Sequence, residues 1–429
     1  MKKVKIAILG FGNVGTGVWK ILHENKKEIM KCSNYDIEVA KILVKDVNKK
    51  RNIEVPKEIF TDNINDIIND ESIKIVVELI GGQEQAKEYM VRAMKAEKHV
   101  VTANKLVIAN WSKELFKIAE EKNVLFYYEA SVAGGIPIIR EINESLTANR
   151  IEKIIGIVNG TTNYILSKMT IEGISFEKAL RKAQEKGYAQ QDPTSDVDGY
   201  DAVYKLAILA SLSFDTEIDP NCIYREGIRN INNIDIQYAK QFGYTIKLLA
   251  IAKEENNKIE LRVHPTLIPS NHQMANVNDA FNAIIIKGNA IGELMLHGRG
   301  FGNLPTGSAV VSDIISILKN NSKPLDLKIL SGEVDLKEVI KFEKNESEFY
   351  IRLNIKEKAE VLRDTVEVFE ENNVSIISVT QEVWHQDYVF IVFIIHKSTE
   401  NNIKNSLRKI KRMKNINKIE SIIRIESFN

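Results

Sequence analysis

The chain has 429 residues, which suggests two or three domains at roughly 100–200 residues each. Its 59 lysine and arginine residues nearly balance 58 aspartate and glutamate residues, so its charge gives no sign of a partner such as nucleic acid or a membrane surface. Two distant cysteines exclude a disulfide framework and a thiolate metal site and suit the cytoplasm, and no apolar run approaches the roughly 20 residues of a membrane helix.

The first part of the chain, residues 1–134, alternates short β-branched runs with longer segments of mixed polar and apolar residues. This alternation predicts a doubly wound parallel sheet, a Rossmann-type α/β domain. A helix expected at residues 307–318 can pack back on this domain, so that residues from about 305–320 complete it. Strands are predicted at residues 4–9, 37–44, 75–79, 99–101 and 124–128, and helices at residues 15–30 and 85–97.

A glycine motif, Gly-Phe-Gly-Asn-Val-Gly at residues 10–15, follows the first strand and opens the first helix. Gly10 permits a tight turn, Gly12 lets the backbone approach a pyrophosphate, and Gly15 lets the helix pack closely on the strand. A purely structural glycine turn is the alternative. The strand before and the helix after the motif favour dinucleotide binding.

Charged side chains after the second strand bear on the choice of cofactor. Basic residues there suit the 2′-phosphate of NADP, whereas Asp46 suits the ribose hydroxyls of NAD. Each charge is equally well explained as a solvated surface group, so NAD and NADP both stay open. The basic residues are Lys45, Lys49, Lys50 and Arg51.

Two motifs near the end of the first part each have a structural and a functional interpretation. Lys105 follows a predicted strand, so it is either a surface lysine in a turn or a side chain at the ligand-binding edge of the sheet. The small residues of the bend at 129–137 form a hinge, or a place where backbone carbonyls bind a cation. The pattern alone favours the hinge.

The second part, residues 135–304, mixes helices with strand-like runs and is predicted to be an α+β domain; the family resemblance described below implies that it is the substrate and dimerisation domain. Asn159 begins the run Asn-Gly-Thr-Thr-Asn-Tyr at the start of a helix. Free backbone N–H groups and hydroxyls there suit a carboxylate, although simple N-capping also explains them. Helices are predicted at residues 176–186 and 202–213, and strands at 154–158, 258–263 and 283–287.

The segment 187–205 combines four acidic residues with the start of an apolar helix. Asp201 and Lys205 are four residues apart and share one face of that helix. Because the helix continues as an apolar run, Lys205 is expected to be partly buried. Burial lowers the pKa of a lysine and makes it a usable proton donor. An ordinary acidic helix N-terminus with one ion pair is the alternative.

The last part begins with a polar linker, residues 321–347, and continues as a compact unit, residues 348–429. The order strand, helix, strand, strand, helix, strand predicts a ferredoxin-like βαββαβ arrangement. Strands are expected at residues 349–355, 374–381, 389–396 and 419–425, and helices at residues 361–372 and 402–412.

Taken together, these segments resemble homoserine dehydrogenases that carry a C-terminal ACT domain, and the resemblance spans nearly the whole chain. The motif at residues 187–210 and the run Asn-Gly-Thr-Thr-Asn at residues 159–163 are highly specific to this family, whereas the glycine motif at residues 10–15 is not. The motifs are GFGNVG at 10–15, TANK at 102–105, EASVAGGIPI at 129–138, NGTTNYIL at 159–166, GYAQQDPTSDVDGYDAVYKLAILA at 187–210 and GRGFGNLPTGSAVVSD at 298–313.

The resemblance implies NAD(P)-dependent interconversion of L-homoserine and L-aspartate 4-semialdehyde, a step toward threonine and methionine. It implies Lys205 as general acid/base, Lys105 at the substrate and nicotinamide end, and Asp201 against the substrate hydroxyl or Lys205. It also implies a homodimer or homotetramer, a sodium-like monovalent cation, and an amino-acid effector at the ACT domain. The implied cofactor residues are Gly10, Phe11, Gly12, Asn13, Val14, Gly15, Lys45, Gly81, Lys105 and Gly302; the substrate residues are Thr161, Tyr188, Gln190 and Asp196; the cation residues are Glu129, Val132, Gly134 and Ile136.

Two departures from the family pattern keep other functions open. Gln190 stands where the family has Glu, and Ala359-Glu360 stands where the ACT ligand loop is typically Pro-Gly. One rival is a Rossmann oxidoreductase that acts on another amino-acid semialdehyde. The other is a catalytically dead amino-acid sensor, against which the retained Lys105, Asp201 and Lys205 argue.

Overall fold

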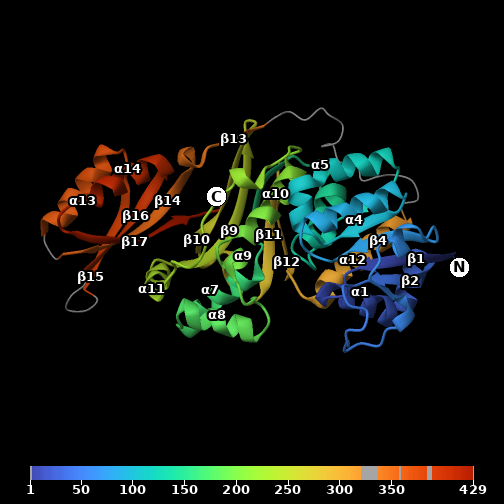
Figure 1. The fold of residues 1–429 in the computed structure, drawn as a ribbon. Coiled ribbons are helices and arrows are strands. Elements are labelled where there is room, and N and C mark those ends of the chain that lie inside the picture. Colours follow the sequence, from blue (N-terminus) through green and yellow to red (C-terminus); the bar gives the residue numbers. More distant parts are fainter. Residues whose placement is uncertain (1, 320–336, 357–358, 384–388, 429) are drawn as a thin grey trace. The chain divides into compact units, whose positions relative to one another are not determined.

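The computed structural model describes residues 2–319, 337–356, 359–383 and 389–428 (Figure 1). As far as they are described, residues 1–154, 204–222 and 281–336 form one compact unit, and residues 155–203, 223–280 and 337–429 form a second. Most of the linker expected at residues 321–347 lies outside the described residues.

A six-stranded parallel sheet with the order β3-β2-β1-β4-β5-β6 is the centre of the first unit. This is the strand order of dinucleotide-binding folds. Successive strands are added on one side of β1 up to β3 and on its other side from β4 onward, and such sheets bind ligands at the point between β1 and β4 where this order reverses. The predicted doubly wound sheet is therefore confirmed. The strands are β1 (Lys2–Leu9), β2 (Tyr35–Leu43), β3 (Phe60–Thr61), β4 (Ile73–Glu78), β5 (His99–Thr102) and β6 (Phe126–Tyr127).

Helices cover both faces of this sheet (Figure 1). On one face, α1 and α12 pack so closely that a Cβ atom on Gly307 would lie 2.9 Å from the backbone of Gly17 and Val18. The single helix expected at residues 15–30 is instead two helices, because Asn25 leaves the helical conformation and ends the first. The helices of the sheet are α1 (Asn13–Glu24), α2 (Lys26–Ser33), α3 (Asn65–Ile68), α4 (Glu84–Lys95), α5 (Lys105–Glu121) and α12 (Asn303–Lys319).

The first unit also contains α6 (Ile138–Arg140) and an antiparallel hairpin, β11 (Phe281–Gly288) and β12 (Gly292–Arg299). Two elements pass from one unit into the other along the chain, β7 (Ile151–Ile157) and α10 (Tyr200–Ser213).

The second unit has a long sheet with the order β9-β10-β17-β14-β16-β15. Its first two strands, β9 (Tyr244–Glu255) and β10 (Lys258–Pro269), form an antiparallel hairpin. The sequence pattern indicated the start of β10 and missed β9. The other elements outside the C-terminal part are α7 (Gly160–Glu172), α8 (Phe176–Glu185), α9 (Thr194–Val197), β8 (Tyr224–Arg225), α11 (Asn233–Gln241) and β13 (Glu338–Val339).

The C-terminal part has the predicted βαββαβ order, and its strand order β17-β14-β16-β15 is that of a ferredoxin-like fold. Its sheet does not end at β17, because Thr266 and Leu267 of β10 pair in parallel with Arg424 and Ile425. The elements are β14 (Glu346–Ile355), α13 (Ala359–Glu371), β15 (Ile376–Val383), β16 (Val389–Thr399), α14 (Glu400–Ile410) and β17 (Ile416–Ile425).

Within the described ranges, no helix is both long enough and apolar enough to cross a membrane.

Candidate active site

The glycine turn between β1 and α1 has the geometry that a dinucleotide requires. Gly10 has φ +95°, and a Cβ atom there would lie 2.6 Å from the carbonyl oxygen of Leu79. At Gly12 a Cβ atom would meet no protein atom within 4 Å, so this side of the turn is open. The N-terminus of α1 follows directly, and its free N–H groups attract an anion such as a pyrophosphate.

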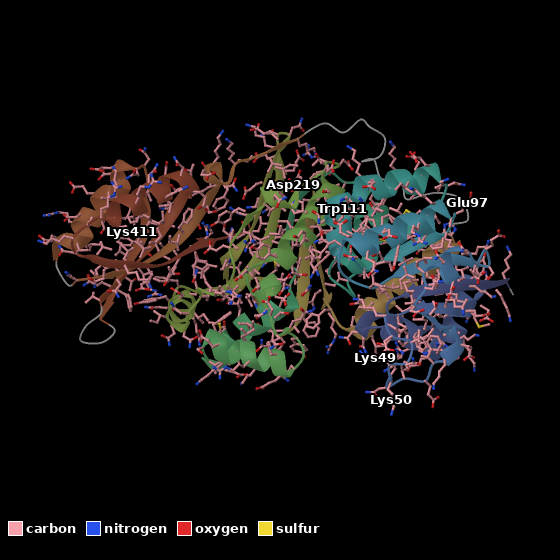
Figure 2. The ribbon with its side chains drawn as sticks, in the orientation of Figure 1. Lys49, Lys50, Glu97, Trp111, Asp219 and Lys411 are labelled. Atoms are coloured by element: carbon pink, nitrogen blue, oxygen red, sulfur yellow. The ribbon has the colours of Figure 1, made fainter. Side chains whose placement is uncertain are left out.

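A pocket opens beside this turn at the carboxyl ends of β1, β2 and β4. Arg51 shapes its rim: the guanidinium donates to the carbonyl oxygens of Asp46 and Lys49, each at 2.8 Å, and lies 4.2 Å from the centre of the Phe60 ring. Lys45 and Lys49 are exposed (Lys49 is labelled in Figure 2). The pocket is lined by Gly10, Phe11, Gly12, Lys45, Asp46, Lys49, Arg51, Ile80, Gly81 and Tyr89, among others.

The remaining expected cofactor residues lie in the same unit but do not line this pocket. Asn13, Val14 and Gly15 form the first turn of α1. Gly302, with φ +120°, directly precedes α12, and Lys105 is the first residue of α5.

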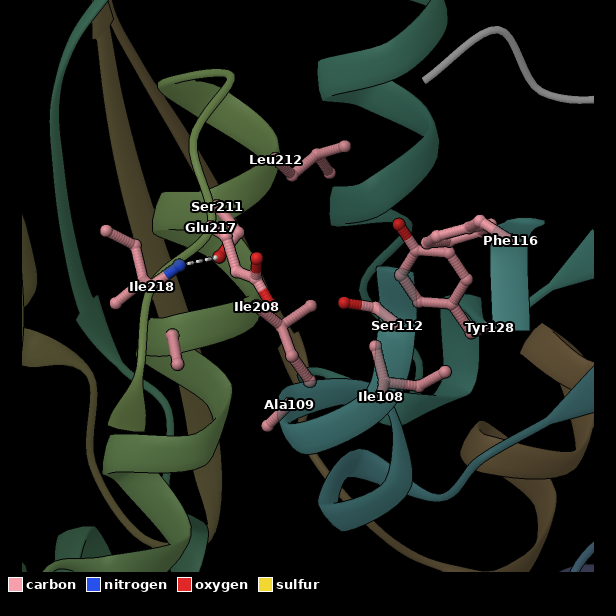
Figure 3. Close-up of a pocket in the computed structure, with 11 residues that line it drawn as sticks. Ile108, Ala109, Ser112, Phe116, Tyr128, Ile208, Ser211, Leu212, Glu217 and Ile218 are labelled. Carbon is pink, nitrogen blue, oxygen red and sulfur yellow. Dashed lines mark hydrogen bonds between the residues drawn. The ribbon is translucent and has the colours of Figure 1, made fainter. Parts of the chain in front are cut away.

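Helices α5 and α10, which carry Lys105 and Lys205, both line one small pocket (Figure 3). Ile108 of α5 and Ile208 of α10 both line it, and each lies three residues after its lysine on the same helix face. Figure 3 shows Ile108 and Ser112 of α5 and Ile208 and Leu212 of α10 around this pocket, whereas Lys105 and Lys205 are not among the residues that line it. Both lysines are partly buried.

Asn159 joins two of the predicted acidic residues in the second unit. Its side-chain N–H donates to Asp196 Oδ1 at 2.7 Å and to Asp201 Oδ2 at 2.8 Å. Its Oδ1 accepts from the Thr162 N–H at 2.8 Å and so caps α7. Asn159 and Asp201 are each 5% exposed, so a buried amide fixes both carboxylates near the start of α7.

The other predicted substrate residues are Thr161, Tyr188 and Gln190. The hydroxyl of Thr161 donates to the carbonyl oxygen of Tyr188 at 2.7 Å, and the Tyr188 ring packs edge-on against Tyr164 at 5.2 Å. Gln190 is exposed, and its carbonyl oxygen accepts from Gln184 Nε2 at 3.1 Å. The contacts thus join Thr161 to Tyr188 and Asp196 to Asp201.

The bend at residues 129–137 is mostly buried and is joined to α6 and α12 by hydrogen bonds. Glu129 accepts hydrogen bonds from the N–H groups of Ile139 and Arg140 at 2.9 and 2.8 Å and thereby caps α6. Its own N–H donates to Asp313 Oδ2 at 2.9 Å. Burial raises the pKa of Glu129 to about 7, against the opposing effect of these hydrogen bonds. Gly134 has φ +50°, and a Cβ atom there would lie 2.5 Å from the carbonyl oxygen of Gly300.

Two family models match the chain. Residues 10–129 match the model described as homoserine dehydrogenase, NAD binding domain, and residues 137–315 match the model described as homoserine dehydrogenase. A homoserine dehydrogenase of Bacillus subtilis is 39% identical, and the match covers 99% of each chain.

The chain belongs to the homoserine dehydrogenase family.

Solved structures agree with this assignment. A homoserine dehydrogenase from Thiobacillus denitrificans is 37% identical, with a TM-score of 0.93 and coverage of 100% of this chain and 99% of that one. A hyperthermophilic archaeal homoserine dehydrogenase in complex with NADPH is 28% identical, with a TM-score of 0.63, and the match covers 75% of this chain and 99% of that one. As a member of the homoserine dehydrogenase family, the protein is an NAD(P)-dependent oxidoreductase.

Sequence reasoning missed three buried polar residues of this homoserine dehydrogenase fold. The sequence predicts Asn159 as the start of a helix motif and not as the side chain that connects two acidic residues. Glu78 and Lys247 lie within apolar strands, and a lone charge in such a run is the signal that points to them. Lys247 is 1% exposed, and its ammonium donates to Asn163 Oδ1 at 3.2 Å and to the Val277 carbonyl oxygen at 2.5 Å.

Proposed function

We propose that the protein interconverts L-aspartate 4-semialdehyde and L-homoserine with NADPH or NADH, in the biosynthesis of threonine and methionine. The observation that carries the proposal is the open glycine turn at Gly12, which lines a pocket at the carboxyl end of β1, in a chain that matches both family models. The NADPH complex of the archaeal relative supports the cofactor class.

In this proposal, the chain's residues position the aldehyde and move one proton. The nicotinamide supplies the hydride chemistry when it is bound. Lys205 gives its proton to the oxygen that becomes the hydroxyl of homoserine, and Lys105 contacts the substrate near the nicotinamide end. Asp201 orients the hydroxyl or Lys205, and Asn159 in turn holds the Asp201 carboxylate at 2.8 Å.

Recognition of the amino-acid end is assigned to Thr161, Tyr188, Gln190 and Asp196. The start of α7 suits the substrate carboxylate, because a helix N-terminus presents unpaired N–H groups and a partial positive charge. Asp196, held by Asn159, suits the substrate ammonium.

A sodium-like cation is proposed at Glu129, Val132, Gly134 and Ile136. No group of three or more histidine, cysteine, aspartate or glutamate side chains that suits a metal occurs in the described part of the chain. The Glu129 carboxylate already accepts two backbone hydrogen bonds, so backbone carbonyls are the ligands to expect. Neutral carbonyl oxygens suit a hard cation of low charge.

We further infer an ACT domain at residues 348–429, with an amino-acid effector, in a cytoplasmic homodimer or homotetramer. The ferredoxin-like strand order supports the ACT assignment. The proposed domain limits are 1–134 with about 305–320, 135–304 and 348–429, with a linker at 321–347.

A substrate screen tests the proposed function against its rivals. The purified chain is assayed with L-homoserine and with other hydroxy amino acids, with NADP⁺ and NAD⁺ as separate oxidants. The proposal expects L-homoserine to have the highest kcat/KM. A higher value for another amino alcohol would favour the different semialdehyde oxidoreductase, and no turnover of any alcohol would favour the amino-acid sensor.

A further inference from the structure

Glu78 is a fully buried acid at the carboxyl edge of the parallel sheet, where β4 ends. Its Oε1 accepts from the N–H of Ile80 at 2.8 Å, and its Oε2 accepts from the hydroxyl of Thr102 at 2.6 Å. Burial raises the pKa of its carboxyl group, and these hydrogen bonds oppose that effect. One side chain therefore contacts both the loop after β4 and the last residue of β5.

The first contact leads to the dinucleotide pocket. Ile80 and Gly81 line that pocket, and Gly81 and Gly82 have φ +71° and +76°. Positive φ angles are accessible mainly to glycine, and glycine adopts many other conformations about as readily. The sequence of the loop alone therefore does not fix its conformation. The hydrogen bond from Ile80 to Glu78 fixes where this loop begins.

The second contact leads to Lys105. The hydroxyl of Thr102 also accepts from the Asn104 N–H at 3.0 Å. Asn104 caps α5 by accepting from the Val107 N–H at 3.3 Å, and its amide donates back to the carbonyl oxygen of Gly82 at 2.8 Å. Hydrogen bonds thus connect the loop at residues 80–82 with the start of α5, through Glu78 and Thr102 and again directly from Asn104 to Gly82. Lys105 directly follows Asn104.

We propose that Glu78 is a positioning residue, which holds the cofactor loop at residues 80–82 and the start of α5 in one register and so sets Lys105 relative to the nicotinamide cofactor. The proposal rests on the function proposed above. An ionised carboxylate accepts on both oxygens, which matches the two donors that face it. A glutamine has the same size but presents an NH₂ group to one of those donors.

The test separates the two contacts with matched variants. Glu78→Gln disturbs both, Thr102→Val removes only the hydroxyl on the Lys105 side, and Thr102→Ser restores it. Lys98→Met is the control for a buried polar group, because Lys98 is 3% exposed and its ammonium donates to the carbonyl oxygens of Asp70 and Ile73 at the other end of β5. For each variant, NADPH affinity is measured by fluorescence titration, and kcat and KM are measured with L-homoserine.

Thr102→Val is expected to lower kcat about tenfold or more at nearly constant NADPH affinity, since a shift of about 1 Å in a catalytic group costs up to about a hundredfold. Glu78→Gln should lower kcat and also weaken NADPH binding severalfold. Thr102→Ser and Lys98→Met should stay within about twofold of the wild type in both quantities.

Wild-type kcat and NADPH affinity in both Glu78→Gln and Thr102→Val would overturn the proposal. It would also be overturned if Lys98→Met lost as much kcat as they do, because the effect would then be general destabilisation. Failure of the proposed function gives a different result: the wild type would not oxidise homoserine. In that case the NADPH titration alone tests the role of Glu78. An NADPH affinity of Glu78→Gln equal to that of the wild type would reject this role.

Discussion

At the scale of single residues, Gln190 is the proposed substrate residue that stands where the resemblance implies a glutamate. A glutamate there would give the substrate ammonium a charge-assisted hydrogen bond of about 1.5–3 kcal/mol, against about 0.5–1.5 for a neutral one. The difference of about 1–1.5 kcal/mol is roughly tenfold in KM. Because the contact is remote from the reacting carbon, Gln190→Glu should lower the homoserine KM severalfold and leave kcat unchanged.

The neighbouring Gln191 offers a matched control for this experiment. It is also exposed, and its carbonyl oxygen accepts from the same Gln184 amide at 3.4 Å. Gln191→Glu should leave KM unchanged. An increase in KM for Gln190→Glu, together with good turnover of another amino alcohol by the wild type, would refute the substrate assignment.

We expect the loop after β2 to determine the preference for NADP or NAD. The Arg51 guanidinium donates to two backbone carbonyl oxygens. Lys45 and Lys49 are the exposed cations among the residues that line the pocket. We expect kcat/KM with NADPH to equal or exceed that with NADH. Lys45→Ala should lower the NADPH value about tenfold and spare the NADH value, because a phosphate contact is worth about 1.5 kcal/mol at the low end.

Lys50 serves as the control for Lys45, since it lies on the same loop and does not line the pocket (Figure 2). Lys50→Ala should change neither kcat/KM. A strong NADH preference in the wild type would mean instead that Asp46 sets the choice.

Motifs named the candidate site residues but did not reveal the contacts between them. Asp196 and Asp201 were both predicted, yet their connection through Asn159 spans 37 and 42 residues of chain and is set by tertiary packing. Glu78 was missed for the same reason, because its partner Thr102 lies on another strand.

At the scale of secondary structure, apolar patterns found the buried strands and failed where the periodicity was weak. The parallel strands β1, β2, β4 and β5 contain short runs of β-branched and other apolar residues and were recognised. Strand β12, whose residues are mostly partly or fully exposed, has no such run and was missed. The break between α1 and α2 depends on the conformation of the single residue Asn25, which an overall helical period does not reveal.

Lys247 gives strand β9 a pH-dependent contribution to stability. Burial lowers its pKa from 10.5 to about 8 in the folded protein. Between these values the unfolded chain binds more protons than the folded one, so the free energy of unfolding should rise with pH from about 8 to about 10.5. At 1.36 kcal/mol per pH unit, the gain is on the order of 3 kcal/mol.

Denaturant unfolding at several pH values in this window measures the effect. Lys247→Met should lose this part of the pH slope, whereas Lys258→Met, at an exposed lysine of β10, should keep it. Equal slopes in the wild type and Lys247→Met would show that Lys247 does not titrate there.

At the scale of the whole molecule, the C-terminal part shares a sheet with its neighbour in the second unit through the β10–β17 pairing. Buried ion pairs reinforce this connection: Arg352 Nε lies 2.9 Å from Asp235 Oδ1, and both residues are at most 1% exposed. The fold class of each part was predictable from local patterns. The pairing of β10 with β17 was not, because it joins segments from different parts of the sequence.

Control by an amino-acid effector should be weak in this chain. Glu360, in the first turn of α13, replaces the glycine expected of an ACT ligand loop, and its carboxylate accepts from Asn415 Nδ2 at 3.3 Å. In the proposed ACT domain, a bulky anion at this position would block the close approach of a ligand and would repel its carboxylate. Threonine should therefore inhibit poorly, and Glu360→Gly should strengthen inhibition. Inhibition of the wild type by low-millimolar threonine would contradict this expectation.

The most direct test of the whole account is reduction of L-aspartate 4-semialdehyde by NADPH, with the product identified by mass spectrometry. The wild type should form one L-homoserine for each NADPH oxidised. Lys205→Ala should lower kcat about 10²–10⁴-fold at unchanged cofactor affinity, as expected for loss of a general acid, while the exposed Lys113→Ala should have no effect. Absence of homoserine, or a Lys205→Ala enzyme within about threefold of wild-type kcat, would contradict the account.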